Sequence, residues 1–474
     1  MIFISHENIN YKKASSYYIV GSLFNKGFSF LTVPIFTRIL STSDYGIVTT
    51  YNSWVSILAM VMGFAIYMGI RAAFIDYKDQ MNNFMSVTTT FTLMSGAVIC
   101  LFVGGGILLL KINVNITMIF LCLIHSLSSA LIQNYSMYLM MQFRYKLRTA
   151  LMILPSLLSV IISVVAILTV VKSELYMGRI VPTAMINVAC GLLILATVYN
   201  KSHMLFNKTY LKYALSISMP LVLHGIALNI LSQSDRTMIT ILADSSQTGI
   251  YSLIYNFSMI ATVITTSLDG VWVPWFTERL KGREIKEINV IAEDYINLMT
   301  YAMIGVILCG PEVVKLLASN KYWEGITIIP PIVLANYIIF AYTLYVNIEH
   351  YHKKTPYITV NTLIAAATNL ILNFIFIPKY GYVAAAYTTL ISYLLAFALH
   401  ARYAKELEKN VYPLKNFVVP FLHIAGAVIM FYVTIDITIL RWGILIIYIG
   451  AMVFKERKRI TYYFPSIKVR FHKH

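Results

Sequence analysis

The stretch SSYYIVGSLFNKGFSFLTVPIFTRIL, residues 15–40, decides how the rest of this chain is interpreted. A helix that crosses a bilayer needs roughly 20 predominantly apolar residues, and this stretch is long and apolar enough. It also carries Lys26, roughly 15 Å from the nearer end of the predicted helix at 1.5 Å per residue. A charged side chain near mid-membrane costs about 2.5–3.5 kcal/mol on insertion scales, so the sequence predicts a polar environment around Lys26.

One face of this predicted helix can supply that environment. Polar residues recur at steps of seven, four, three and eight, which places them on the same face: Ser15, Ser22, Lys26, Ser29 and Thr37. Asn25 is the neighbour of Lys26, and the opposite face is wholly apolar. We expect the polar face to border a water-filled cavity that holds a positive charge. The alternative is a structural ion pair that buries Lys26.

The composition predicts an all-α polytopic membrane protein. Of 474 residues, 58% are hydrophobic and only 12% are charged, whereas soluble domains carry about 25% charged residues. The net charge of +17 fits the excess of Lys and Arg that membrane proteins keep on the cytoplasmic side. Nucleic acid is excluded as a partner because the basic residues are dispersed over many short loops. The four cysteines lie far apart in apolar segments and predict neither a metal site nor disulfides.

About fourteen transmembrane helices are predicted from the apolar segments. Their ranges are 15–38, 46–70, 84–110, 116–141, 150–171, 178–199, 211–234, 248–272, 289–310, 325–348, 357–377, 382–404, 415–434 and 437–454. With the N-terminus cytoplasmic, most of the 37 Lys and Arg residues fall in segments on the inner side. The sequence therefore predicts cytoplasmic N- and C-termini. Arg38 and Arg441 are expected to snorkel at the outer interface.

A faint internal repeat predicts the organisation of these helices. The segment from Arg38 through Gly46 to Asn52 resembles the segment from Arg236 through Gly249 to Asn256. Six spans per half would make the halves parallel repeats, so we expect two six-helix bundles that form a central cleft. The predicted domains are an N-terminal lobe, a C-terminal lobe, two additional helices and a basic cytoplasmic tail, at residues 1–210, 211–410, 411–455 and 456–474.

The seventh predicted span offers a second set of candidate site residues. Asn229, Ser232 and Arg236 share one helical face by the same spacing argument. With the first helix they complete the predicted lining of the cleft, where substrate would bind: Lys26, Arg236, Asn25, Ser22, Ser29, Asn229 and Ser232. Candidates for coupling to an ion gradient are the titratable residues His224, Asp235 and Asp269. A histidine in the position of His224 is more often a packing residue than a proton carrier, and Arg236 could equally lie at the outer interface.

Enzyme motifs are missing from the sequence. No phosphate-binding loop and no carboxylate pair on an outer loop is found, so we expect no catalytic residue and no cofactor. Glu349, His350 and His352 resemble a metal cluster, but they precede Lys353 and Lys354 and are interpreted as a solvated cytoplasmic loop. No metal is predicted.

Several motifs occur in order along the chain. The most specific runs from Asn369 to Gly381, reading NLILNFIFIPKYG, and is followed by the small-residue helix around Ala384. Others are Leu40–Gly46, the Ser-Asp-Arg at 234–236 with Gly-Ile-Tyr-Ser at 249–252, and Pro311–Val314 with Tyr322-Trp323. Together they resemble the polysaccharide-transporter family, the Wzx-type flippases of the multidrug/oligosaccharidyl-lipid/polysaccharide exporter superfamily. Where the family often has a glycine before the alanines, this chain reads YVAAA at residues 382–386.

The resemblance implies translocation of undecaprenyl-diphosphate-linked oligosaccharide repeat units across the bacterial cytoplasmic membrane by alternating access, for O-antigen, capsule or exopolysaccharide synthesis. Implied partners are this lipid-linked substrate, membrane lipids, and the polysaccharide polymerase and chain-length machinery. A diphosphate needs positive charge while it crosses a low-dielectric region, which suits Lys26 and Arg236.

Other functions stay open at this point. A multidrug or cation antiporter of the same superfamily should have an acidic cavity, whereas Lys26 is basic. A lipid II flippase would differ only in its substrate. A membrane glycan polymerase or ligase is the remaining alternative, although such enzymes usually need a large outer loop and the outer loops predicted here are short.

Overall fold

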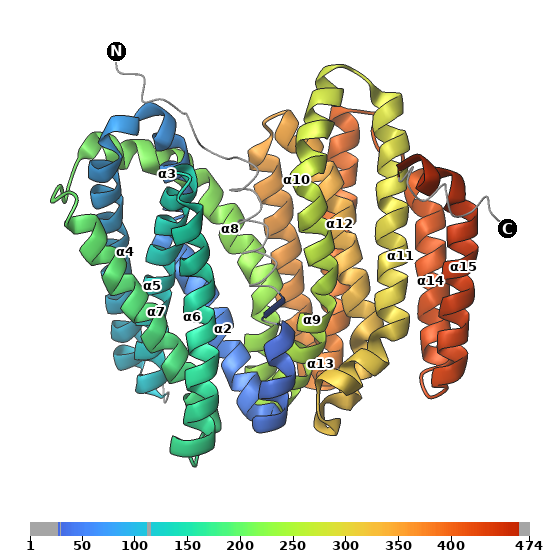
Figure 1. The fold of residues 1–474 in the computed structure, drawn as a ribbon, viewed down its shortest axis with the longest axis horizontal. Helices are drawn as coiled ribbons and strands as arrows, with labels where there is room; N and C mark the ends of the chain where they lie inside the picture. The colour runs from blue at the N-terminus through green and yellow to red at the C-terminus, as the bar shows by residue number, and fades with distance from the viewer. Residues whose placement is uncertain (1–26, 29, 111–114, 464–474) are drawn as a thin grey trace. The chain divides into compact units, whose positions relative to one another are not determined.

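The protein is built of helices (Figure 1), and no strand occurs within residues 27–28, 30–110 and 115–463, which the computed structural model describes. The first described helix is Phe30–Ile39. It is followed by α2 (Thr42–Gly63), α3 (Ile66–Asp76), η1 (Lys78–Gln80), α4 (Met81–Leu110), α5 (Ile116–Met141), α6 (Tyr145–Val165), η2 (Ala166–Val170), α7 (Leu175–Tyr199) and α8 (Lys208–Leu242). The second half of the chain contains α9 (Ser245–Ser258), α10 (Ile260–Lys281), α11 (Ile285–Leu317), η3 (Asn320–Ile328), α12 (Ile329–Tyr351), α13 (Thr355–Leu407), α14 (Lys415–Val433) and α15 (Thr438–Tyr463).

The protein is a multi-pass membrane protein by the length and apolar character of these helices. Among the described residues, 9 helices are long and apolar enough to cross a membrane, or up to 11 if two bent pairs each count as one span. One bent pair is α2 with α3, which meet at 42° where Phe64 and Ala65 adopt left-handed backbone conformations. The total of fourteen spans stays a prediction.

Helix α13 contains two of the predicted spans within 53 residues. Gly381 interrupts it with φ 58° and ψ −145°, a conformation that side chains other than hydrogen rarely allow. A Cβ atom at Gly381 would also lie 2.0 Å from Oε1 of Gln247. The glycine that ends the Ile-Pro-Lys-Tyr-Gly motif is therefore required by both backbone conformation and space.

The chain divides into two compact units. The first comprises Met1–Leu253 with Lys353–Ala396, and the second comprises Ile254–His352 with Phe397–His474. The predicted boundary between the lobes at residue 210 stays a prediction, as do the two additional helices as a separate part.

In the first unit, the N-termini of α2 and α9 cross in direct backbone contact. A Cβ atom at Gly46 would lie 1.8 Å from the carbonyl oxygen of Ser245, and one at Gly249 would lie 2.0 Å from that of Thr42. Hydroxyl pairs flank the glycines, Thr42 with Ser246 at 2.5 Å and Ser43 with Ser245 at 2.6 Å. Small residues permit such close helix approach in membranes, where van der Waals packing replaces the hydrophobic effect.

This crossing joins the two segments that the internal repeat had paired. Gly46 and Gly249 are corresponding positions of that repeat, and Ser252 donates a 2.9 Å hydrogen bond to Thr49, its own counterpart. The start of α2 is further fixed by a capping box, in which the Asp44 amide donates to the Ser41 hydroxyl and the Ser41 amide to the Asp44 carboxylate. Corresponding positions thus face each other across the crossing.

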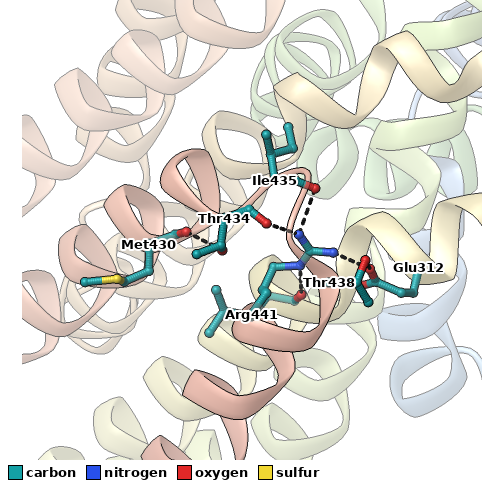
Figure 2. Close-up of polar contacts among 7 residues, drawn as sticks. Glu312, Met430, Thr434, Ile435, Thr438 and Arg441 are labelled. Carbon is teal, nitrogen blue, oxygen red and sulfur yellow. Dashed lines mark hydrogen bonds and ion pairs between the residues drawn. The ribbon is translucent and has the colours of Figure 1, made fainter.

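In the second unit, α14 and α15 pack beside α11 (Figure 1). Arg441, at the start of α15, is fully buried and binds the carboxylate of Glu312 on α11 (Figure 2). Its guanidinium also donates to the carbonyl oxygens of Leu308, Thr434 and Ile435. The expectation that Arg441 snorkels at an interface is wrong, because the end of α14 and the last third of α11 provide acceptors inside the protein. Arg38, by contrast, is exposed.

The segment at the end of α12 also differs from the sequence interpretation. Glu349 is fully buried, and Nδ1 of His400 lies 2.9 Å from its Oε2 and 3.0 Å from its Oε1. His352 lies 3.0 Å from Glu408, which also accepts two hydrogen bonds from Arg283. The prediction of a solvated loop is therefore wrong for Glu349, since α13 brings His400 to it from 51 residues away. The described residues contain no group of three His, Cys, Asp or Glu side chains able to hold a metal ion.

Candidate functional site

The predicted lining of the first helix falls mostly outside the described residues. Ser22, Asn25, Lys26 and Ser29 all belong to this undescribed part, so their proposed roles remain predictions. The remaining candidates lie on α8 and α10 and can be located.

A polar cavity of about 600 Å³ lies within the first unit, between α2, α3, α5, α6, α7 and α8. Its polar lining consists of amides, hydroxyls and one guanidinium: Asn52, Ser56, Tyr67, Ser129, Gln133, Ser136, Arg148, Asn187 and Asn229. The apolar remainder is Val55, Ala59, Met60, Ile132 and Met137. The volume lies in the usual range of pockets that hold a small organic ligand.

The cavity arises from polar stripes on apolar helices. On α2, Asn52 and Ser56 are one turn apart, and on α5, Ser129, Gln133 and Ser136 follow at steps of four and three. Asn52 and Gln133 are exposed and make no side-chain hydrogen bond to any described residue. An amide without partners is costly in hydrocarbon, so these two side chains face water rather than lipid.

Arg148 gives the cavity its charge. It lies in the first turn of α6, and its Nε donates a 3.2 Å hydrogen bond to the hydroxyl of Ser136. None of the described residues that line the cavity is Asp or Glu. The lining therefore presents a positive potential together with neutral donors and acceptors, an arrangement that favours anionic over cationic ligands.

Of the seventh-span candidates, only Asn229 lines this cavity. Its Oδ1 accepts a 2.9 Å hydrogen bond from Ser56, which links α8 to α2. Ser232 is partly buried and donates to the Asn229 carbonyl at 3.4 Å. Arg236 is buried, and its guanidinium donates to the Ser232 carbonyl at 3.0 Å and to Gln233 at 3.1 Å. The structure thus separates Arg236 from the cavity that Asn229 lines.

Asp235 lies at the centre of a buried hydrogen-bond network in the first unit. Its carboxylate accepts from Tyr251 at 2.6 Å, Asn373 at 2.6 Å and Thr389 at 2.7 Å. Asn373 also accepts from Thr388, and Asn369 also donates to Thr389. The network joins α8, α9 and both parts of α13 around one carboxylate. Three donors stabilise the ionised form of a buried carboxylate, whose desolvation would otherwise be costly.

The other two titratable candidates are less connected to these features. His224 lies on α8 and is partly buried, and the residues that line the cavity do not include it. Asp269 lies within α10, and its side chain is outside the described part of the structure.

Sequence reasoning missed several residues that the structure brings together. Asn52, Gln133 and Arg148 were not candidates, although the polar spacing on α5 was visible in the sequence. Arg148 falls between the predicted spans 116–141 and 150–171, and only the packing of α6 against α5 and α7 directs its side chain into the cavity.

Comparisons with known proteins agree with this architecture. A family model described as polysaccharide biosynthesis protein matches residues 11–279, more than half of the chain. Lsg locus putative protein 1 of Haemophilus influenzae is 23% identical over 282 residues, which cover 58% of this chain and 67% of that protein. An uncharacterized membrane protein of the same organism is 23% identical over 361 residues, covering 73% and 85%.

Solved structures show the same fold at low sequence identity. Lipid II flippase MurJ in an inward closed conformation matches with a TM-score of 0.64 and 16% identity, covering 93% of this chain and 99% of that one. An inward-facing multidrug resistance MATE family transporter of the MOP superfamily matches with a TM-score of 0.61 and 13% identity, covering 84% and 99%. The chain therefore belongs to the polysaccharide biosynthesis protein family, and it has the fold of the MurJ and MATE structures.

Proposed function

We propose that this protein is a flippase that translocates undecaprenyl-diphosphate-linked oligosaccharide repeat units across the bacterial cytoplasmic membrane. The observation that carries the proposal is the polar cavity with Arg148 and no acidic side chain among its described lining residues, set among apolar membrane helices. Sugar hydroxyls can exchange hydrogen bonds with its amides and hydroxyls, and a phosphate or acidic sugar is attracted by its positive charge. Family membership agrees with a substrate that contains a glycan.

Lys26 and Arg236 have different roles in this proposal. Lys26 is proposed to contact the diphosphate or an acidic sugar, with Ser22, Asn25 and Ser29 as neutral partners on or beside the same helix face. Arg236 is held by Ser232 and Gln233 in this conformation, so it contacts substrate only if α8 changes its packing. The two predicted bundles would then alternate in opening their cleft to either side of the membrane.

Asp235 is proposed to bind the coupling ion, a proton or a monovalent cation. The carboxylate is satisfied by three donors from α9 and α13. The carboxylate has about four lone-pair sites, so a proton or cation can take the fourth, and the loss of negative charge weakens the three charge-assisted hydrogen bonds. Occupancy of Asp235 would therefore change how α8 packs on its neighbours. His224 and Asp269 remain secondary candidates for this role.

The proposed setting is the bacterial cytoplasmic membrane with both termini in the cytoplasm. The basic turn at Arg144, Lys146 and Arg148 would then lie at the cytoplasmic side, where substrate is loaded. A polysaccharide polymerase and chain-length proteins would receive the translocated repeat units on the other side.

Reconstitution with defined lipid-linked oligosaccharides tests the function directly. Purified protein in vesicles should increase the fraction of fluorescent undecaprenyl-diphosphate oligosaccharide that reaches the outer leaflet, compared with protein-free vesicles. Export that persists unchanged in a Lys26→Ala variant would remove Lys26 from the mechanism. Efflux of organic cations without movement of lipid-linked oligosaccharide would instead establish a multidrug antiporter, and longer glycan chains would indicate a polymerase.

A further inference from the structure

An apolar groove of about 480 Å³ lies on the first unit, and no described residue lines both this groove and the polar cavity. Its walls come from α2, α4, the segment between α7 and α8, and the start of α8. Met94 and Val98 on α4 and Phe206 before α8 line it and are largely exposed. The groove therefore opens outward from the helices, toward the hydrocarbon that surrounds a membrane protein.

The polar residues among the described lining of the groove, Thr90 and Ser95, have their hydroxyl groups bonded within the protein. Ser95 donates to the carbonyl oxygen of Met62. Thr90 donates to the carbonyl oxygen of Ser86 at 2.9 Å and lies 2.9 Å from the hydroxyl of Tyr199. A sugar or a peptide in the groove would leave polar groups without hydrogen bonds, which is costly, whereas a hydrocarbon chain has none to lose. The lining thus favours a hydrocarbon chain.

The length of the groove matches one leaflet of a bilayer. Val87 and Ile99, which both line it, are twelve residues apart on α4, or roughly 18 Å at 1.5 Å per residue. The hydrocarbon core of a bilayer is about 30 Å thick, so each leaflet contributes about 15 Å. Because one acyl chain of a phospholipid spans one leaflet, the groove can contact such a chain along its whole length.

The segment between α7 and α8 lies at the Val87 end of the groove. The hydroxyl of Ser86 donates a 3.0 Å hydrogen bond to the carbonyl oxygen of Ser202, and the hydroxyl of Ser202 donates to Asn83 at 2.7 Å. These bonds attach the segment to the first two turns of α4, next to Val87. The start of α8, which follows this segment, is therefore held at the same end of the groove.

Two lysines at the start of α8 give this end of the groove a positive charge. Lys208 and Lys212 are exposed and one helical turn apart, and Leu211 between them lines the groove. Among the described residues, no carboxylate forms a salt bridge with either lysine. Asp76 accepts a hydrogen bond from Tyr213, which is two residues from Leu211 and so lies on nearly the opposite side of α8.

We propose that this groove is a binding site for an anionic membrane phospholipid, in which one acyl chain lies along α4 and Lys208 and Lys212 bind the headgroup phosphate. Lysine clusters beside membrane helices attract anionic lipids, and the apolar groove adds packing contacts with the chain. A zwitterionic phospholipid has the same chains, but its cationic group cancels the charge of its phosphate, so it should bind more weakly.

Native mass spectrometry of the purified full-length protein tests the headgroup contact. The delipidated protein is titrated with dioleoylphosphatidylglycerol or dioleoylphosphatidylcholine, and the apparent Kd of the first bound lipid is measured. The anionic lipid should bind about fivefold more tightly or better. Lys208→Gln with Lys212→Gln should weaken its binding about tenfold or more and change that of the zwitterionic lipid less than about twofold. Lys353→Gln with Lys354→Gln, which removes the same charge at exposed positions outside the described lining, should change either Kd less than about twofold.

A variant that fills the groove tests the contact with the acyl chain. Met94→Trp places a larger side chain in the groove and should weaken the binding of both phospholipids about threefold or more, because the chain loses packing contacts. Leu101→Trp is the matched control, since Leu101 is an exposed residue further along α4 that is outside the described lining. Thermal unfolding in detergent confirms that each variant is folded.

The proposal is overturned if the two phospholipids bind the unmodified protein equally, or if the folded double lysine variant keeps full affinity for dioleoylphosphatidylglycerol. Normal lipid binding by folded Met94→Trp would also overturn it. Undecaprenyl phosphate that binds more tightly than dioleoylphosphatidylglycerol, and is lost in the same variants, would instead make the groove a site for the carrier chain. None of these measurements requires transport, so the phospholipid site and the proposed flippase function can fail independently.

Discussion

The side-chain amide of Asn373 donates a 2.6 Å hydrogen bond to Oδ1 of Asp235, and both side chains are fully buried. This contact connects α13 to α8 across 138 residues of sequence. With the hydrogen bonds from Tyr251 and Thr389, it means that a change in the protonation or ion occupancy of Asp235 affects the contacts of α8 with α9 and with both parts of α13. A coupling site of a transporter needs this property, because ion binding has to alter helix packing.

Asp235→Asn should abolish the response of transport to an imposed ion gradient. The amide cannot release a proton, and it offers a donor where Asn373 already donates. We also expect a loss of stability of about 1–3 kcal/mol from the mismatched buried group. Transport in vesicles with and without a proton or sodium gradient measures the first effect. Asp79→Asn, at an exposed carboxylate, is the matched control, and gradient-dependent transport by Asp235→Asn would exclude Asp235 from coupling.

Arg441→Met should destabilise the second unit by about 1–3 kcal/mol, the usual cost of leaving polar groups without their hydrogen-bond donor, since Glu312 is only partly buried. The change removes the guanidinium that donates to Glu312 and to the carbonyl oxygens at the end of α14 (Figure 2). Thermal unfolding in detergent should show the loss, while Arg402→Met at an exposed arginine should unfold like the unmodified protein. Combining Arg441→Met with Glu312→Gln should cost less than the sum of the single changes. Unchanged unfolding of Arg441→Met would contradict the assigned role.

The pair Glu349 and His400 should show the same non-additivity. His400→Leu leaves a fully buried carboxylate without its partner, so it should lower stability more than Glu349→Leu together with His400→Leu. Thermal unfolding of the three variants completes the cycle, with Glu406→Leu as the control at an exposed glutamate. A double variant less stable than His400→Leu would show that the ion pair is not what His400 contributes.

Joining the helices at the α2–α9 crossing should stop transport. Thr42→Cys with Ser246→Cys places two thiols where the hydroxyls now lie 2.5 Å apart, close enough for a disulfide. In a background without the four native cysteines, oxidation should block lipid-linked oligosaccharide transport and reduction should restore it. Peptide mass spectrometry measures the disulfide, and each single cysteine variant is the control. Full transport by the oxidised protein would mean that α2 and α9 need not separate.

Much of the fold followed from apolar length alone. The helical class, the positions of the apolar segments and the break at Gly381 were all visible in the sequence, because hydropathy and glycine act locally. The pairing of Gly46 with Gly249 was visible only as a repeat. The backbone contact between the two glycines depends on which helices cross, and no local sequence pattern predicts that.

The candidate site was less accessible to sequence reasoning. Asn373 stood out as part of a motif, yet nothing in the sequence connects it to Asp235. Arg441 sits at the predicted end of a helix, where snorkelling is the usual outcome, and only the carbonyl oxygens of α14 and the carboxylate of Glu312 make burial favourable. Arg148 lies in a basic turn whose other charged residues, Arg144 and Lys146, are exposed. The direction of its side chain depends on helix packing and could not be predicted from the sequence.

The crossing of α2 and α9 also limits how this protein can diversify. Elsewhere the two repeats pack against different residues, so that their sequences can diverge by single substitutions. At Gly46 and Gly249 the two repeats pack against each other. A methyl group added at either glycine would therefore collide with the backbone of the other repeat. In relatives, a substitution of one glycine should therefore be accompanied by substitutions around the other, so that the two positions change together.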